Sequence, residues 1–296
     1  MKTNNFLKVF FIFASAIIML ISCNSRPSNE NPNDDGTLSK SQGTTVNSDQ
    51  PLNVSVYLDL SDRLTRQMTP SQKDRDIEIV SNLCTIVKSH AVSQKILPSK
   101  DRIKVFFYPS PADSKIGLLS KDLEMDLSQC QPAAKKKELQ TLSEKFKKSL
   151  EQIYQSTLAS KQWIGSDIWG FFKKQVDAYC IKKGYRNIIV ILTDGYIFYA
   201  PNKQNSGNAY NYILPQTLDV NDSKLMVARK GLEDLEVLLL EINPYNPQHQ
   251  DKMEKILCDW FTEMGIKSNN IYIGETDQPS NTKLIIDNFM TRSEQE

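Results

Sequence analysis

The sequence contains few of the residues from which metal and catalytic sites are most often built. Its 296 residues include two histidines, His90 and His249, which lie far apart in the chain. None of its five cysteines belongs to a CxxC pair or a Cys/His cluster, which argues against a zinc site. The motifs GxSxG, HExxH, GxxxxGK and GxGxxG are also absent, so no signature of a serine hydrolase, zinc protease or nucleotide-binding loop is present.

An excess of charge of one sign is also missing. The chain carries a net charge of +1, and without Lys2 and Lys8 it has 34 basic and 35 acidic side chains. This balance provides neither the basic surface typical of nucleic-acid binding nor a polybasic run typical of binding to anionic lipid. We therefore expect no nucleic-acid partner, and interpret the stretch "AAKKKE" from residue 133 as the solvated face of a helix.

The apolar run from Val9 to Ile21 is too short to cross a bilayer and is typical of the core of a signal peptide. It leads into "LISC", which resembles the lipobox of bacterial lipoproteins. The resemblance implies a signal peptide over residues 1–22, a lipidated Cys23, and anchoring to a membrane of the cell envelope, with the outer membrane expected. An uncleaved anchor and a plain secretory signal are the alternatives. Residues 23–50 have almost nothing to bury and are expected to form a disordered tether.

After the tether, apolar runs rich in β-branched residues alternate with amphipathic helical patterns. The expected strands are Asn53–Leu58, Arg102–Tyr108, Asn187–Thr193, Leu235–Ile242 and Asn270–Ile273, and the expected helices are Asp74–His90, Ala133–Leu158, Asp167–Lys183, Gln248–Met264 and Asn281–Met290. This alternation predicts one α/β domain over residues 51–292, with a doubly wound, largely parallel sheet and helices on both faces. Its four cysteines, Cys84, Cys130, Cys180 and Cys258, are expected to be free and buried, although an exported location permits a disulfide.

Polar residues follow three of the predicted elements and should meet at the carboxyl edge of the sheet. The first group is Asp59, Ser61, Asp62 and Arg63 after the strand "VSVYLD"; the second is "GSD" at residues 165–167; the third is Asp194 and Gly195 after "NIIVILT". Each group alone is also typical of a turn or a helix cap. Together they indicate either a cation site or three ordinary turns.

In this order, the three groups resemble the von Willebrand factor A domain and its metal-ion-dependent adhesion site. Asp59 and Ser61 match the start of that family's Asp-x-Ser-x-Ser motif, Ser166 stands where the family has a threonine, and Asp194 matches its last acidic position. The resemblance implies an Mg²⁺ ion held by Asp59, Ser61, Ser166 and Asp194, with a coordination position open to an acidic group of a partner protein. Such a site binds and has no nucleophile arranged for turnover, so an enzyme is not expected.

Arg63 departs from the family pattern because it replaces the second serine of the motif. A divalent ion and a guanidinium about 5 Å apart repel each other by roughly 7 kcal/mol at an effective dielectric constant near 20. Either Arg63 points away and a weakened Mg²⁺ site survives, or its guanidinium takes the place of the cation among the carboxylates. The resemblance therefore implies a degenerate site whose Mg²⁺ binding is weak or absent.

The expected function is protein binding through this edge of the sheet. Asp62, Arg63, Tyr196 and Tyr199 are the candidate partner-binding residues, the two tyrosines belonging to a long loop on the rim of the site. The partner is expected to be a protein of the cell envelope or exterior. The alternatives are a phosphohydrolase that uses Asp59 as its nucleophile, and a structural subunit of an envelope assembly with an inactive site.

Overall fold

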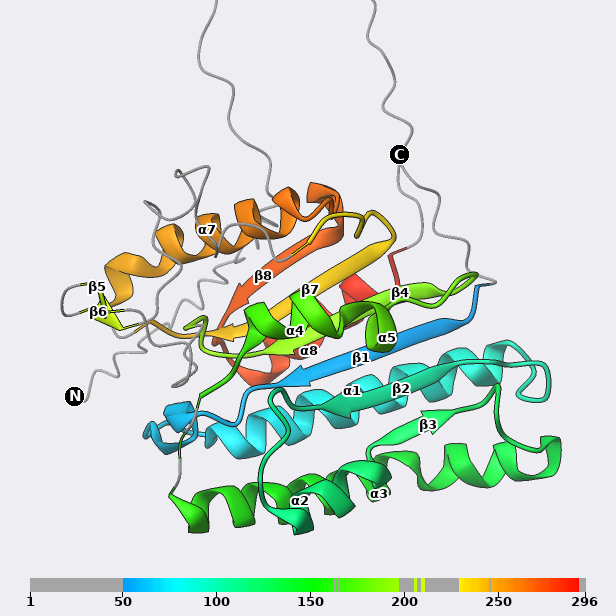
Figure 1. The fold of residues 1–296 in the computed structure, drawn as a ribbon. Coiled ribbons are helices and arrows are strands. Elements are labelled where there is room, and N and C mark those ends of the chain that lie inside the picture. Colours follow the sequence, from blue (N-terminus) through cyan, green and yellow to red (C-terminus); the bar gives the residue numbers. More distant parts are fainter. Residues whose placement is uncertain are drawn as a thin grey trace, which may run out of the picture.

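The computed structural model describes residues 50–161, 163, 165–196, 205–206, 209–210, 229–244 and 246–292. These residues form a six-stranded sheet in the order β3-β2-β1-β4-β7-β8, shown in Figure 1. The strands are β1 (Leu52–Leu58), β2 (Arg102–Phe106), β3 (Glu124–Asp126), β4 (Arg186–Leu192), β7 (Leu235–Ile242) and β8 (Ile271–Glu275). The edge strand β3 is antiparallel to β2, and the other pairs are parallel. The predicted fold class is confirmed.

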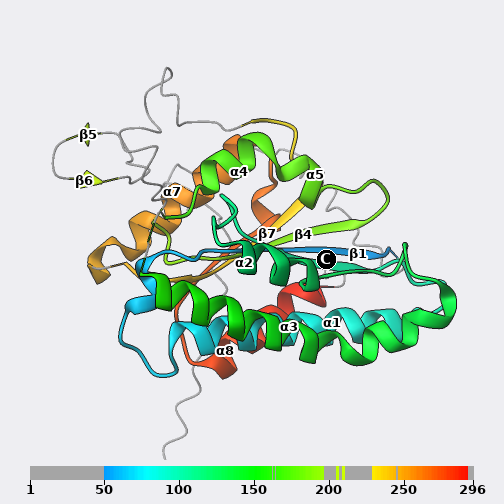
Figure 2. The same ribbon diagram turned by 60° about the horizontal axis from the view of Figure 1, so that its bottom comes forward.

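Helices cover both faces of the sheet (Figure 2). One face carries α1 (Gln72–Ser93), α3 (Pro132–Ser160) and α8 (Pro279–Met290), and the other carries α4 (Ile168–Lys174), α5 (Val176–Cys180) and α7 (Gln250–Glu263). The shorter elements are the helix α2 (Ser114–Leu119) and short 3₁₀ turns such as η1 (Asp62–Thr65). A small hairpin is formed by β5 (Asn205–Ser206) and β6 (Ala209–Tyr210). Two apolar cores result, one on each side of the sheet.

The central position of β4 follows from its sequence, because every side chain of "RNIIVIL" is buried. Ile188 and Val190 enter one core, while Ile189 and Ile191 enter the other. β4 pairs with β1 from Leu52↔Arg186 onwards and with β7 on its other side. β4 therefore lies beside β1 in the middle of the sheet, the position typical of strands that are apolar on both faces.

The structure differs from the predicted elements in two places. The helix expected over residues 167–183 is divided into α4 and α5 at Gln175, whose φ of −126° leaves the helical range. The break allows Phe171, Phe172 and Cys180 to reach the same core. The second difference is that β3 and α2 are additional elements; β3 has only three residues, too few to show an alternating pattern.

Three of the domain's four cysteines are free as expected, but Cys130 is only half-buried. Cys84, Cys130 and Cys180 are free thiols. Burial raises the pKa of the Cys84 and Cys180 thiols to about 12, so both are inert at neutral pH. Cys258 is buried as predicted.

The segments expected to be the signal peptide and most of the tether lie outside the described residues, as does Cys23. Among the residues that the structure does describe, no helix combines the length and the apolar character that crossing a bilayer requires.

Candidate functional site

The loops that follow β1 and β4 are joined by hydrogen bonds at the carboxyl edge of the sheet. The Asp59 carboxylate accepts a hydrogen bond from the Ser61 backbone N–H (2.8 Å) through Oδ1 and from the Thr193 hydroxyl (2.8 Å) through Oδ2. The Asp59 backbone N–H donates to the Leu192 carbonyl (3.0 Å). Both oxygens of this 1% exposed carboxylate are therefore engaged within the chain.

The loop that precedes α4 reaches the same edge through Tyr57 of β1. The Tyr57 hydroxyl lies 2.7 Å from the Ser166 hydroxyl and donates to the Tyr108 carbonyl (2.8 Å). Asp167 then caps α4 by accepting a hydrogen bond from the Gly170 backbone N–H (2.8 Å). A Cβ at Gly170 would lie 2.1 Å from the Asp167 Oδ2 atom, so only glycine fits this cap. Ser166 is 3% exposed and is held in place by these contacts.

Arg63 points into the protein and is 1% exposed. Its Nη2 atom lies 2.6 Å from Oδ2 of Asp76 in α1, and its Nε atom donates to the Asp59 carbonyl (2.9 Å) and lies 4.0 Å from Asp59 Oδ2. Burial lowers the pKa of this guanidinium, but Asp76 and then Asp59 raise it by more, so Arg63 stays charged. Of the two arrangements considered for Arg63, the structure has the one with the guanidinium among carboxylates.

Sequence analysis missed Asp76, which is the main partner of Arg63 and is fully buried. The Tyr154 hydroxyl of α3 donates to Asp76 Oδ2 (2.6 Å), and the Gln72 side-chain amide donates to Oδ1 (3.0 Å). A signal was present in the sequence, because Asp76 lies four residues before Val80 and four after Gln72, on the buried stripe of the helix. A charge on that stripe indicates a buried partner.

Asp194 lies at the same edge and is 6% exposed. Its Oδ1 atom accepts a hydrogen bond from the Tyr196 backbone N–H (3.2 Å). Burial, and then the negative charge of Asp59, raise the pKa of this carboxyl to about 7, while Arg63 acts in the opposite direction. The following Gly195 has φ +92°, and a Cβ there would lie 2.4 Å from the sulfur of Met253, so the Asp-Gly pair is required by backbone geometry as well.

These residues do not fit a bound Mg²⁺ ion. The guanidinium of Arg63 already occupies the space between Asp59 and Asp76, and a divalent ion about 5 Å away would be repelled by roughly 7 kcal/mol. The hydroxyls that would be ligands, those of Ser61 and Ser166, contact the Arg63 backbone N–H (3.5 Å) and the Tyr57 hydroxyl instead. Across the described residues, no group of three or more His, Cys, Asp or Glu side chains is arranged to hold a metal.

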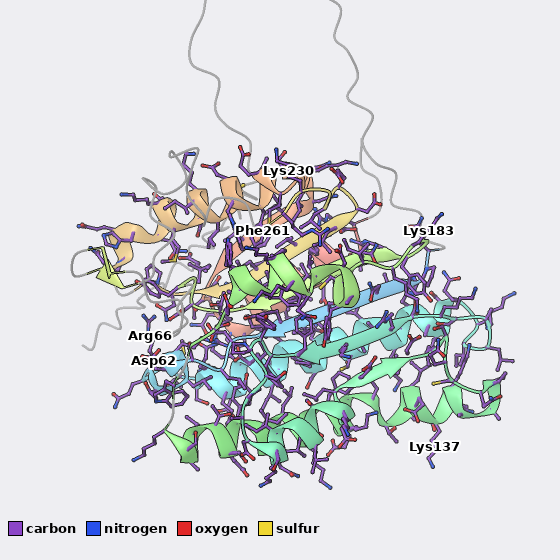
Figure 3. The ribbon with its side chains drawn as sticks, viewed as in Figure 1. Asp62, Arg66, Lys137, Lys183, Lys230 and Phe261 are labelled. Carbon is purple, nitrogen blue, oxygen red and sulfur yellow. The ribbon has the colours of Figure 1, made fainter. Side chains whose placement is uncertain are left out.

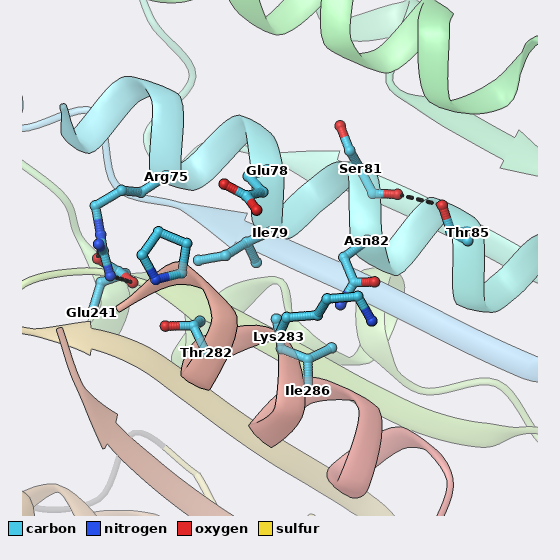
Figure 4. A pocket seen from close by; sticks show the side chains of 11 residues that line it. Arg75, Glu78, Ile79, Ser81, Asn82, Thr85, Glu241, Thr282, Lys283 and Ile286 are labelled. Carbon is cyan, nitrogen blue, oxygen red and sulfur yellow. Dashed lines mark hydrogen bonds and ion pairs between the residues drawn. The ribbon is translucent and has the colours of Figure 1, made fainter. Parts of the chain in front are cut away.

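The buried ionic network continues across the sheet to β7. Gln72 also donates to Glu241 Oε2 (3.2 Å), and Arg75 forms a two-point ion pair with Glu241 at 2.7 and 2.9 Å. Glu241 has φ +73° at an irregularity in the β7–β8 pairing, a backbone conformation that costs energy for a non-glycine residue. Figure 4 shows Arg75 and Glu241 together at one end of a cavity of about 210 Å³ between α1 and α8.

Few of the predicted partner-binding residues reach solvent at this edge. Asp62 is exposed and Tyr196 is half-buried, whereas Arg63 has its donors engaged inside the chain. Tyr199 lies outside the described residues. A second cavity of about 130 Å³ adjoins Ser166 and is lined by Leu60, Tyr108 and two prolines of the loop after β2, among others.

Comparison with known proteins assigns the chain to no family. No family model and no curated protein matches it. Among solved structures, it is similar to an aerotolerance-related membrane protein from Bacteroides fragilis (16% identity, TM-score 0.38, 81% of this chain and 98% of that one). It is also similar to the pilus adhesin SpaC from Lactobacillus rhamnosus GG (13%, TM-score 0.41, 84% and 30%) and to proximal thread matrix protein 1 from the mussel byssus (12%, TM-score 0.37, 82% and 48%). The chain spans about a third of the adhesin and half of the mussel protein.

Proposed function

We propose that this chain is a lipid-anchored protein of the cell envelope whose α/β domain binds another protein through the loops at the carboxyl edge of its sheet. Cys23 would carry the lipid, and the segment up to residue 50 would serve as the tether. The binding edge is the degenerate form of the von Willebrand factor A site that the sequence resembles, with Arg63 in place of the metal ion.

The observation that carries this proposal is that the loops after β1 and β4 meet on a buried, ion-paired foundation, with the loop before α4 joined to the same edge through Tyr57. Asp59, Arg63 and Asp76 are each no more than 1% exposed and hold the loop after β1 rigidly against β4 and α1. Asp62 follows directly on this foundation and faces solvent. A rigid support beneath exposed loop residues lowers the entropy lost when a partner binds.

The environment of Asp59 supports binding rather than hydrolysis. A carboxylate nucleophile must reach its substrate with a free oxygen, whereas both oxygens of Asp59 accept hydrogen bonds and the residue is buried. The cavity beside Ser166 supplies the other part of a recognition surface, because its apolar and proline side chains, including Leu60 of the loop that carries Asp62, can enclose an apolar side chain of the partner.

Site-specific photo-crosslinking tests the proposal. A crosslinking amino acid at Asp62 should give a defined adduct in intact cells, and the same group at Lys183, at the opposite edge in Figure 3, should not. In a binding assay with the isolated partner, the Asp62→Arg variant should bind more weakly than the wild type. The Asp234→Arg variant, which reverses the charge of an exposed acid elsewhere, should bind like the wild type. The adduct should persist in EDTA, because the cation of the site is Arg63.

Three results would contradict the proposal. Equal adducts from positions 62 and 183 would show that the edge has no preference for a partner. Hydrolysis of p-nitrophenyl phosphate by the purified chain, lost in Asp59→Asn, would favour the phosphohydrolase. A partner that contacts only other faces would favour a structural subunit with an inactive site.

A further inference from the structure

The corner of the protein where α1 ends and α3 begins carries a group of exposed lysines. They are Lys88, Lys95, Lys100, Lys136 and Lys137, called here the basic corner. None of these side chains has an ion-pair partner within the described part of the chain. Two acids adjoin these lysines in sequence: Asp101 is fully buried and accepts hydrogen bonds from the Leu52 backbone N–H and the Ser99 hydroxyl, and Glu138 lies 3.8 Å from the ammonium of Lys145 outside the corner. The corner therefore presents uncompensated positive charge to solvent.

Two apolar side chains project among these lysines. Val92 is 52% exposed and Leu97 is 62% exposed, which makes them two of the four large hydrophobic residues exposed on the described surface. The loop that carries Leu97 is fixed, because the Lys135 ammonium donates to the Leu97 and Ser99 carbonyls, both at 2.7 Å. The structure thus holds Leu97 outward on a rigid loop instead of folding it into the core.

The basic corner belongs to the amino edge of the sheet, opposite the candidate binding site. In Figure 3, Lys137 and Lys183 lie at one end of the molecule and Asp62 and Arg66 at the other. β1 also begins at this amino edge, at Leu52, so residues 1–49 join the domain on the same side as the lysines. Under the proposed function, the lipid on Cys23 is tethered to the domain at this edge.

We propose that the basic corner rests on a bilayer that contains anionic phospholipid, with Leu97 and Val92 inserted among the headgroups. Lysines around an exposed leucine combine electrostatic attraction to anionic lipid with burial of apolar surface, the two contributions that peripheral membrane binding uses. A nucleic acid would use the lysines but would leave both apolar side chains in water. Docking in this way orients the domain with Asp62 facing away from the membrane, independently of what binds there.

The sequence concealed this surface because its lysines come from three separate segments. Lys88 lies on α1, Lys95 and Lys100 lie on the loop before β2, and the "AAKKKE" stretch supplies the others. Only the packing of α3 against α1 brings them together. The interpretation of "AAKKKE" as a merely solvated face is therefore replaced by this proposal.

Vesicle co-sedimentation tests the proposal on the full chain carrying Cys23→Ala, which removes the acylation site. Vesicles of phosphatidylcholine alone measure binding through the leader, and vesicles with 30% phosphatidylglycerol add the anionic surface. Because each lysine near an anionic surface contributes about fivefold to partitioning, Lys95→Glu/Lys100→Glu/Lys136→Glu should lower binding to anionic vesicles at least about 100-fold. Leu97→Ser should lower it about tenfold, since it removes most of an inserted side chain.

The matched control is Lys115→Glu/Lys121→Glu/Lys252→Glu, which reverses three exposed lysines outside the corner and gives the same net charge. It should bind anionic vesicles like the parent chain, and 0.5 M NaCl should weaken the parent's binding to them. Equal losses in both triple variants would show a net-charge effect and overturn the proposal. Equal binding of the parent chain to the two vesicle types would overturn it as well. So would a result in which the lysines of the basic corner are needed for binding duplex DNA but not for binding vesicles. Circular dichroism confirms folding of every variant.

Discussion

Asp194→Asn should stabilise the protein at alkaline pH and have little effect at acidic pH. Asp194 is 6% exposed, and burial and Asp59 together raise its pKa to about 7. An aspartate in an unfolded chain titrates near pH 3.9. Between these two pH values the folded protein keeps a proton that the unfolded chain has released, so the free energy of unfolding falls as pH rises. Above pH 7 the folded state must hold a buried charge.

The size of the effect follows from the difference in pKa. About three pH units correspond to roughly 4 kcal/mol of destabilisation that is complete above pH 7 and absent below about pH 4. Asparagine keeps the carbonyl that accepts the Tyr196 hydrogen bond but carries no charge at any pH. In a domain of this size, 1 kcal/mol shifts the melting temperature by about 2–4 °C, so a gain of about 8–16 °C is expected at pH 8.

Thermal unfolding followed by circular dichroism at pH 4 and pH 8 measures the effect. Asp62→Asn is the matched control, because it removes an exposed carboxylate from the same edge and should change stability by less than about 0.5 kcal/mol at either pH. The reasoning is refuted if Asp194→Asn changes the melting temperature equally at both pH values, or if the variant is less stable than the wild type at pH 8.

Three further predictions concern the cation, the sheet and the anchor. Arg63→Ser should lower the free energy of unfolding by about 3–5 kcal/mol, because it leaves Asp76 unpaired. Mg²⁺ at 100 times its dissociation constant should restore about 2.7 kcal/mol of stability to this variant and none to the wild type. Calorimetric Mg²⁺ binding to the wild type would contradict this. Ile189→Asp should abolish cooperative melting, because it buries an unpaired carboxylate in the central strand, and a melt close to that of the wild type would show the opposite. Cys23→Ala should move the protein out of membranes washed with 0.5 M NaCl, which removes electrostatic binding through the basic corner, and mass spectrometry of the wild type should find acyl chains on Cys23. A cleaved Cys23→Ala protein that stays in the washed membranes would exclude lipid anchoring.

The main strands and long helices were predictable because the local hydrophobic pattern of the sequence indicates which of their residues are buried. β4 and β7 are continuous apolar runs, and the stripe of α3 recurs at helical spacing. Elements that depend on distant partners were not predictable. β3 has three residues and exists because it pairs with β2, and the break at Gln175 depends on the core that α4 and α5 share.

The candidate site was predictable in its membership and less so in its interactions. Asp59, Ser61 and Asp194 follow strands whose carboxyl ends must meet, so their proximity followed from topology. The orientation of Arg63 did not, because it depends on Asp76 from α1 and Tyr154 from α3. Nothing within the "DLSDRL" stretch itself indicates that a carboxylate thirteen residues later would receive the guanidinium.

The covalent attachment of Arg63 has a consequence for how this edge can be regulated. A bound metal ion has a dissociation constant, so its occupancy follows the supply of the ion, the presence of chelators and competition from other metals. A guanidinium on the chain has none of these dependencies, and its occupancy of the space beside Asp59 is always complete. The loop after β1 is thus held in a single state in environments that fluctuate in divalent ions. Under the proposed function, control over partner binding then comes from the supply of the partner or from pH.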